Sequence, residues 1–471
     1  MTALTTATPY SVANPRQVSH AAVLAVLSTA AFMASLDLFI VNVAFANIAH
    51  EFHGESLGNL SWILNGYAVL YAALLVPLGR LADRYGRKSG FLAGLALFTV
   101  ASVACAVSPN LWSLVAFRGL QAVGAAALTP TSLGLLLAAT PDTDKVKAVR
   151  IWAAVGALAA AFGPVVGGLL VQADWRWVFL VNLPVGIVAL VAAQRWVPDS
   201  RDIAVERVPD LVGAAYLTVG VGALALALVK GPDWGWASVG DIAAFVVAVV
   251  ATVAFWLRSG SHDLPVIELS LLRVRAFAWS NLTTVLFNVG FGASLLVMVL
   301  WLQDVWHYSP IRTGLAIAPG PLMVPVFAAA TQRFAKRVGP GALVSIGCLL
   351  FATGTLMAAA CVGAHPSYAG ELLPGWIIGG MGVGFALPTI MSAATADLPA
   401  SRASTGSAVV SMSRQIGLVL GVSLFVAILG APVGYAQLHD AFRHVWWMIA
   451  GAMLAAAVTA PGMTPRTAPT R

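Results

Sequence analysis

The sequence predicts an all-α membrane protein with fourteen transmembrane helices. Of its 471 residues, 59% are hydrophobic and 10% are charged, and the apolar residues gather in runs separated by short polar segments. Soluble domains contain about 45–50% apolar and about 25% charged residues, so this composition excludes a water-soluble globule. The runs match the length of about 20 residues that carries a helix across a bilayer.

The first span starts after a polar N-terminal tail, residues 1–20. The apolar run that follows is too long for the hydrophobic region of a signal peptide, so we expect a retained helix. A second tail, 462–471, ends the chain. The predicted spans are 21–48, 59–81, 89–108, 111–138, 148–172, 176–196, 211–230, 239–257, 277–303, 311–332, 341–363, 372–396, 406–430 and 444–461.

The distribution of Lys and Arg predicts the orientation, because loops on the cytoplasmic side are enriched in these residues. With the N-terminus inside, the outer loops hold only Arg176, Lys230, Arg312 and Arg443. The inner loops hold Arg80, Arg84, Arg87, Lys88, Lys145, Lys147, Arg150, Arg195, Arg201, Arg207, Arg258, Arg273, Arg275, Arg333, Lys336, Arg337 and Arg402. The net charge of +7 therefore indicates the positive-inside pattern and not a nucleic-acid partner. We expect N-in and C-in topology in the inner (plasma) membrane.

A short internal repeat predicts the architecture. The segment 79–86 reads GRLADRYG and the segment 332–339 reads QRFAKRVG, with Arg, Ala, Arg and Gly in register. Parallel repeats of this kind occur in transporters whose two halves rock against each other. We expect six-helix bundles at 21–196 and 277–461, with an inserted helix pair in 197–276.

One acidic residue lies well inside a predicted span. Asp37 is roughly 13 Å from the outer end of the first span, and Arg118 roughly 10 Å from the outer end of the fourth, at 1.5 Å per residue. An ionisable group at this depth is a functional candidate by default. We expect Asp37 to couple transport to protons, with Arg118 and Gln121 as its partners. The alternative is a permanent structural ion pair.

Two further polar residues are candidates for a substrate cavity, Asn42 in the first span and Arg414 in the thirteenth. Arg414 lies within about two turns of the predicted inner end of its span. An arginine there can extend its side chain to the membrane interface, which is the alternative to a role in gating or binding.

The fifth span is rich in glycine, with Gly156, Gly163, Pro164, Gly167 and Gly168. Small residues allow close helix approach, and proline bends a helix. Both suit a seam that opens and closes, although ordinary tight packing explains them equally well. The prolines Pro319, Pro321 and Pro325 in the tenth span have the same two interpretations.

Other classes of protein find little support in the sequence. Cys105, Cys348 and Cys361 lie in apolar runs without metal-ligand spacing, so we expect buried free thiols and no metal site. The spans contain no cluster of catalytic residues, which argues against an enzyme. A membrane sensor or scaffold that transports nothing remains a distinct hypothesis, and it predicts that Asp37→Asn leaves activity intact.

These motifs resemble those of the fourteen-span drug:proton antiporters of the major facilitator superfamily, the EmrB/QacA type. The resemblance rests on 79–88 (GRLADRYGRK), 36–44 (LDLFIVNVA), 118–126 (RGLQAVGAA), 156–168 and 175–184 (WRWVFLVNLP). Ala122 stands where the family usually has glycine. Exporters of the methylenomycin-resistance type from actinomycetes are similar in length and pattern.

The resemblance implies a major facilitator fold and proton-coupled efflux of small lipophilic drugs, antibiotics or metabolites. It identifies Asp37 as the proton-linked aspartate and the fifth-span glycines as an antiporter motif. It also implies a conformational latch made of Gly79, Asp83, Gly86, Arg87 and Lys88.

We expect no cofactor beyond the proton gradient and a functional monomer. With one deep carboxylate, the cavity suits neutral or singly charged lipophilic substrates and not dications. The alternative is a proton-coupled importer or facilitator with the same fold.

Overall fold

The computed structural model describes residues 20–141, 143–201, 209–399 and 402–464, and it confirms the predicted fold class. In the described part of the chain, fourteen helical segments are long and apolar enough to cross a membrane. The helices are α1 (His20–Glu51), α2 (Leu57–Tyr85), α3 (Arg87–Ala106), α4 (Leu111–Ala139), α5 (Lys145–Ala173), α6 (Trp177–Leu180), α7 (Asn182–Trp196), α8 (Leu211–Trp234), α9 (Val239–Ser261), α10 (Leu269–Leu272), α11 (Arg275–Leu300), α12 (Pro310–Ile317), α13 (Pro319–Val338), α14 (Pro340–Cys361), α15 (Leu373–Ala396), α16 (Ala403–Leu429) and α17 (Gly434–Thr459).

Several spans are composite. The sixth consists of α6 and α7, and the tenth of α12 and α13, which separate at Ala318 just before the proline cluster. A π-helical turn, Trp301–Val305, extends α11, and a second one, Tyr368–Leu372, precedes α15. Proline lacks the backbone N–H that a continuous helix needs, which explains the break at Pro319.

Short polar residues begin many of these helices. Ser56 accepts a hydrogen bond from the backbone N–H of Asn59 at 3.2 Å, and Asn110 and Ser113 form a reciprocal capping box at the start of α4. Asp210 caps α8 by accepting from Gly213 at 2.8 Å. Such caps satisfy backbone donors that have no partner in the first turn, so these local sequences fix where the spans start.

The final span differs from the prediction. It begins at Gly434 and not near residue 444, because polar side chains occupy its first turns and weaken the hydropathy signal. Arg443, expected in an outer loop, lies instead on an exposed face of α17. Apolar packing holds this extension, since Phe442 and Trp446 contact the ring of Trp301 with centroids 5.1 and 5.2 Å apart.

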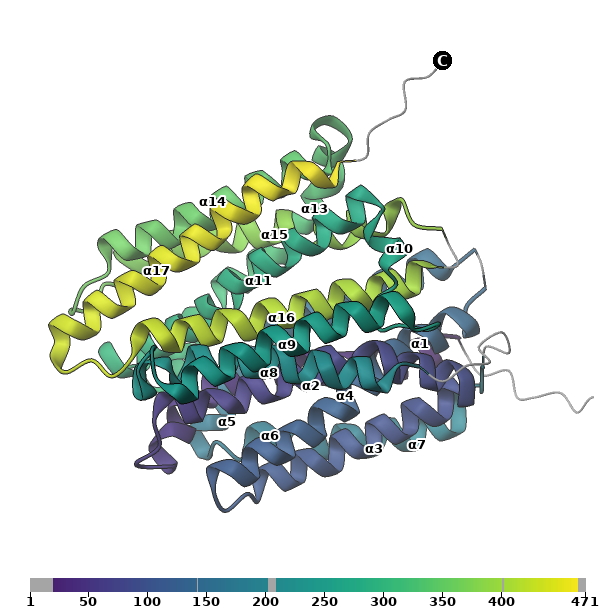
Figure 1. Cartoon of the computed structure of the whole chain (residues 1–471), viewed down its shortest axis with the longest axis horizontal. Helices are drawn as coiled ribbons and strands as arrows, with labels where there is room; N and C mark the ends of the chain where they lie inside the picture. The colour runs from purple at the N-terminus through teal and green to yellow at the C-terminus, as the bar shows by residue number, and fades with distance from the viewer. Residues whose placement is uncertain (1–19, 142, 202–208, 400–401, 465–471) are drawn as a thin grey trace, which may run out of the picture.

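The long helices run side by side in two groups, which we name the N-terminal bundle (α1–α7) and the C-terminal bundle (α11–α17) (Figure 1). Within the first, α1 packs on α5, and α4 packs on α2 and α3. Within the second, α14 packs on α15 and α17, and α11 on α16 and α17. The main contacts between the bundles are α2 with α16 and α5 with α12. The division at 21–196 and 277–461 remains a prediction.

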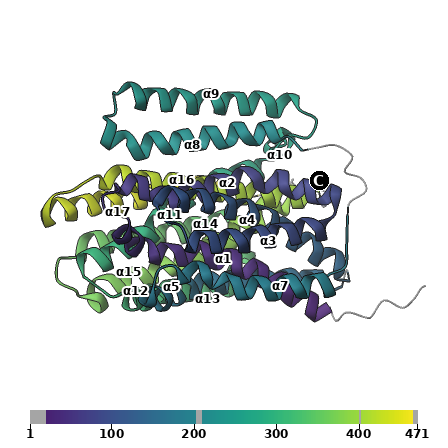
Figure 2. The ribbon, with the colours of Figure 1, turned by 90° about the horizontal axis from the view of Figure 1, so that it is seen from below.

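The pair α8 and α9 lies on the outside of the bundles (Figure 2). Its two helices pack against each other, and α8 also contacts α2 and α16. An ion pair connects α8 and α9 at one end, where Arg258 Nε donates to Asp210 Oδ1 at 2.7 Å. The pair therefore covers the α2–α16 contact between the bundles.

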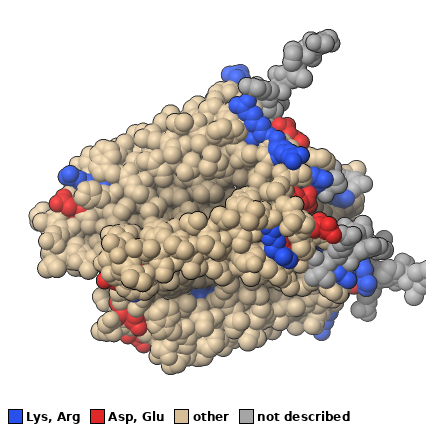
Figure 3. All heavy atoms as spheres, in the orientation of Figure 1, with Lys and Arg blue, Asp and Glu red and all other residues tan. Residues whose placement is uncertain are grey.

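The two ends of the molecule differ. On the face shown in Figure 3, most Lys and Arg side chains gather at one end, on the right of the view. The largest apolar core includes Val43 of α1, Leu300 of α11 and Phe425 of α16, so it crosses between the bundles near the end where α1 finishes. Burial of this continuous apolar surface holds the bundles together at that end.

Candidate functional site

The structure brings the two predicted membrane-embedded charges together. Asp37 on α1 is 0% exposed and Arg118 on α4 is 1% exposed, and Nη1 of Arg118 donates to Oδ2 of Asp37. Their similar predicted depths therefore do correspond to a contact. Breaking such a buried pair by removing one partner costs about 3–5 kcal/mol, because the remaining charge is left unpaired.

Gln121 completes a small network around this pair. Its Oε1 accepts from Arg118 Nη1 at 2.6 Å, and its Nε2 donates to Asp37 Oδ1 at 2.9 Å. Gln121 lies one turn after Arg118 on α4, so both side chains project toward α1. The amide thus contacts both charged partners at once.

Two members of the network were not predicted as site residues. Asn182 at the start of α7 donates to Asp37 Oδ1 at 3.4 Å and to Ser102 Oγ at 2.9 Å. Ser102 on α3 also accepts from Gln121 at 3.0 Å and donates to the carbonyl of Phe179 at 3.0 Å. Asn182 lies in the segment 175–184 that carried part of the family resemblance, whereas a serine in an apolar helix gives no signal of its own.

The guanidinium of Arg118 has further partners in α2. Its Nε donates to the carbonyl of Ile63 at 3.3 Å, and its Cζ lies 4.2 Å from the centre of the Tyr67 ring. An aromatic face stabilises a cation at this distance, more strongly where water is excluded. Arg118 is therefore held from both sides, by the Asp37 carboxylate and by the Tyr67 ring.

The predicted latch residues lie at the junction of α2 and α3. Arg87 Nε donates to Asp83 Oδ1 at 2.6 Å, and Arg87 Nη1 donates to Ser200 at 3.3 Å. Lys88 donates to the carbonyl of Gln194 at 2.9 Å. Gly86 has a backbone φ of +127°, a value that residues other than glycine rarely adopt. These bonds all stay within the N-terminal bundle and the segment that follows α7.

A different pair joins α2 to the chain that enters the C-terminal bundle. Arg80 donates to Glu268 Oε1 at 2.9 Å and to the carbonyl of Pro265 at 2.8 Å. Arg402 Nη1, beside α16, lies 3.7 Å from Glu268 Oε2. Glu268 was not predicted as a site residue, because an acidic residue in a short loop has no pattern that reveals its partner. Gly79, the residue before Arg80, packs against α4, where a Cβ would lie 3.0 Å from Pro130.

The glycines of α5 lie on two close helix contacts. A Cβ at Gly163 would lie 2.6 Å from Phe39 Cβ on α1, and one at Gly167 would lie 3.0 Å from Ile40. A Cβ at Gly168 would lie 2.5 Å from the carbonyl oxygen of Pro310 on α12. These positions thus let α5 approach both α1 and the opposite bundle.

Gly156 and Pro164 differ in their roles. A Cβ at Gly156 would meet only Ser35 Oγ at 3.6 Å, an ordinary contact, so the expectation of close approach is wrong at this position. Gly156 lies two turns before Gly163, where α5 and α1 leave more space. Pro164 lies inside α5, and its carbonyl faces Gly314 of α12 at the contact between the bundles.

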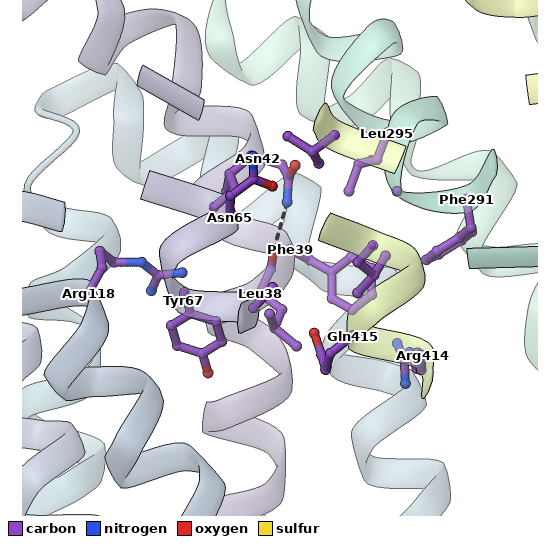
Figure 4. A pocket seen from close by; sticks show the side chains of 15 residues that line it. Leu38, Phe39, Asn42, Asn65, Tyr67, Arg118, Phe291, Leu295, Arg414 and Gln415 are labelled. Atoms are coloured by element: carbon purple, nitrogen blue, oxygen red, sulfur yellow. Dashed lines mark hydrogen bonds between the residues drawn. The ribbon is translucent and has the colours of Figure 1, made fainter. Parts of the chain in front are cut away.

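A cavity of about 60 Å³ lies between the bundles, next to the charge network (Figure 4). Leu38, Phe39, Asn42, Leu64, Asn65, Tyr67, Ala68, Arg118, Phe291, Gly292, Leu295, Arg414, Gln415, Leu418 and Val422 line it. Both predicted cavity residues, Asn42 and Arg414, are among them, and Asn42 donates to the carbonyl of Leu38 at 2.7 Å. Because ligand pockets usually measure about 300–1,000 Å³, this conformation has room for part of a drug-sized molecule only.

The sequence model of the Major Facilitator Superfamily matches residues 27–422. Among curated relatives, the multidrug resistance protein Stp of Mycobacterium tuberculosis (strain CDC 1551 / Oshkosh) is 35% identical over 85% of this chain and 74% of its own length. The methylenomycin A resistance protein of Streptomyces coelicolor is 34% identical over 71% of this chain and 70% of its own. The tetracenomycin C resistance and export protein of Streptomyces glaucescens is 34% identical over 70% of this chain and 61% of its own.

Solved structures share the fold at lower sequence identity. A peptide transporter of the POT type in complex with sulfate superposes with a TM-score of 0.66 and 17% identity, covering 93% of each chain. A mutant form of the nucleoside transporter NupG gives a TM-score of 0.64 with 12% identity, covering 94% of this chain and 98% of the other. At these identities the likeness establishes the arrangement of helices alone.

Proposed function

This chain belongs to the Major Facilitator Superfamily, and on that premise we propose that it exports small lipophilic compounds, including drugs or antibiotics, in exchange for protons. The observation that carries the proposal is the fully buried Asp37–Arg118 pair beside a cavity between two helix bundles. Relatives named for multidrug resistance and for antibiotic resistance and export support the direction of transport.

The chemistry of the pair supports proton coupling. A guanidinium keeps its charge in proteins, so Asp37 is the member that exchanges a proton. When water reaches the carboxylate and a proton binds, the attraction to Arg118 is lost and the network around Gln121 and Asn182 changes its bonding. A proton binds from one side of the membrane and is released to the other. The same residues then alternate between two arrangements, one with the proton bound and one without it.

Alternating access needs surfaces that separate and close. The α5–α12 contact at Gly168 and the α2–α16 contact are the surfaces that separate in the proposed cycle. The apolar core that crosses between the bundles near the end of α1 then closes one side of the cavity. The Arg80–Glu268 and Asp83–Arg87 ion pairs lie near the other side, where they form or break as that side closes or opens.

We further propose N-in and C-in topology in the plasma membrane, with the proton gradient as the energy source and the monomer as the working unit. The enrichment of Lys and Arg at one end supports this orientation. The end where α1 finishes then faces outward, and the latch residues at the α2–α3 junction face the cytoplasm.

Everted membrane vesicles test the proposal directly. With an imposed inside-acid pH gradient, we expect vesicles that contain the protein to accumulate a lipophilic antibiotic, and we expect Asp37→Asn to abolish the accumulation at equal expression. Uptake of the compound into intact cells, driven by the proton gradient, would instead establish a proton-coupled importer. Activity that survives Asp37→Asn would reject proton coupling at this residue.

A further inference from the structure

The charges that face the central cavity do not balance. Two guanidinium groups, those of Arg118 and Arg414, line the cavity, and none of the lining residues is acidic. Asp37 neutralises Arg118 from behind the cavity wall, since it contacts Arg118 without lining the cavity itself. The charge of Arg414 is therefore the one left uncompensated at the cavity surface.

Arg414 lies deep in its helix. It follows Ala403, the first residue of α16, by eleven positions, which is about 16 Å at 1.5 Å per residue. Its Nε is buried without a hydrogen-bond partner, and its guanidinium forms no ion pair with any residue in the described ranges. A charge without a partner inside a membrane is costly, so a counter-ion from elsewhere would stabilise an arginine in this position.

Three polar atoms of other residues that line the cavity are also unsatisfied within the described chain. They are the Tyr67 hydroxyl, Asn65 Oδ1 and Gln415 Oε1, in side chains that belong to residues exposed by 1%, 0% and 3%. In native proteins the large majority of buried polar side-chain atoms have a partner. All of these atoms belong to residues that line the same cavity, with Tyr67 on one side and Gln415 and Arg414 on the other (Figure 4). The cluster therefore has the composition of a binding site.

The chemistry of this cluster selects the ligand. A guanidinium binds a carboxylate through two parallel hydrogen bonds, and it repels a cation. A neutral ligand would leave Arg414 without a counter-ion inside the membrane. Phe39, Phe291 and Leu418 offer apolar surface for the rest of the molecule.

We propose that the substrates of this transporter are amphiphilic monoanions, and that Arg414 binds their carboxylate. This inference rests on the proposed export function and adds a substrate class to it. Arg414 then recognises the substrate in the C-terminal bundle, while Asp37 handles the proton in the N-terminal bundle. The two charged sites lie on opposite sides of one cavity, so binding of the anion and exchange of the proton act on the same contact between the bundles.

Three matched fluorescent probes test the proposal on the purified protein in nanodiscs. Dansylglycine carries one negative charge, dansylglycinamide is neutral and nearly the same size, and N-dansylethylenediamine carries one positive charge. We expect dansylglycine to bind at least about tenfold more tightly than the other two, in line with the strength of charge-assisted bonds. Equal binding of dansylglycine and dansylglycinamide to the unaltered protein would overturn the proposal.

Variants locate the effect. Arg414→Gln should abolish the preference for dansylglycine, Arg414→Lys should keep most of it, and Arg443→Gln, at an exposed arginine on α17, should leave it unchanged. A preference that survives Arg414→Gln would show that another group binds the anion. Proton-driven accumulation in vesicles is measured separately. If the unaltered protein shows no preference for dansylglycine but still exports substrate, this inference alone is overturned. If it binds dansylglycine with the expected preference but shows no proton-driven efflux, the proposed function is overturned.

Discussion

The two bundles treat membrane-embedded charge in opposite ways. In the N-terminal bundle, Asp37 and Arg118 are enclosed by Gln121, Asn182 and Tyr67, and each charged group has several partners. In the C-terminal bundle, Arg414 reaches the cavity with no partner for its Nε among the described residues. The first arrangement stores a charge pair that a proton can disrupt, and the second presents a charge that a ligand can neutralise.

This difference separates two tasks that a coupled transporter must combine. In the proposed mechanism, residues of α1, α4 and α7 hold the proton-exchanging group, whereas α16 faces the substrate. Because α16 packs against α2, and Tyr67 of α2 contacts Arg118, the two sites share one intervening helix. A shift of α2 is thus one physical route between them.

Asp37→Asn should have the largest effect, because asparagine cannot ionise and leaves the Arg118 charge unpaired. We expect proton-driven efflux to fall at least about a hundredfold, consistent with about 3–5 kcal/mol for breaking a buried pair. Substrate uptake into everted vesicles measures this efflux. Asp233→Asn is the control, since Asp233 is exposed and, among the described residues, forms an ion pair only with Lys230, at 3.3 Å. Full efflux by the Asp37 variant would remove the distinction between the bundles.

Gly168→Ala comes next, and it tests the contact between the bundles. The new Cβ would lie 2.5 Å from the Pro310 carbonyl oxygen, so α5 and α12 must separate. Overpacking of this kind costs about 1–3 kcal/mol, so we expect a lower melting temperature and about a tenfold loss of efflux. Gly156→Ala is the matched control, because its Cβ meets ordinary contact only. Equal effects of both variants would contradict the role of the Gly168 contact.

The effects of replacing the two amides around Asp37 should follow the number and length of their hydrogen bonds to charged groups. Gln121→Leu removes bonds to Asp37, Arg118 and Ser102. We expect efflux to slow at least about tenfold, since each bond to a charged group contributes about 1.5–3 kcal/mol and about 1.4 kcal/mol corresponds to tenfold. Asn182→Leu removes one longer bond to Asp37, of 3.4 Å, and a bond to the neutral Ser102 hydroxyl, of 2.9 Å, and should have a smaller effect. Initial rates of substrate uptake into everted vesicles measure both, and the reverse order would show that Asn182 is the more important partner.

Substitutions that break the partly exposed ion pairs should have the smallest effect on stability. Asp83 and Glu268 have side chains that are 32% and 26% exposed, so Asp83→Asn and Glu268→Gln should each lower the free energy of unfolding by about 1 kcal/mol or less. Thermal unfolding in detergent checks this. The predicted latch requires Asp83→Asn to reduce efflux more than this small loss explains. A larger reduction by Glu268→Gln would assign the latch to the pair that joins α2 to the C-terminal bundle.

The sequence by itself determined the membrane class, the fourteen spans and the single deep carboxylate. Each of these depends on local composition: apolar runs form spans, and a charged residue inside such a run stands out wherever it lies. The partner of Asp37 was also predictable, because depth along a helix follows from counting residues. The start of α17 was not, since polar first turns are held in the helix by packing against Trp301.

Only the tertiary structure decided which side chains face one another across helices. Ser102 and Asn182 join the Asp37 network, and Arg414 lines the cavity, because of helix rotation and crossing that no run of residues encodes. The same holds for Gly156 and Gly168, which belong to one motif but meet different surroundings. Spans arise from each segment's own transfer into the bilayer, whereas sites arise from contacts between segments distant in sequence.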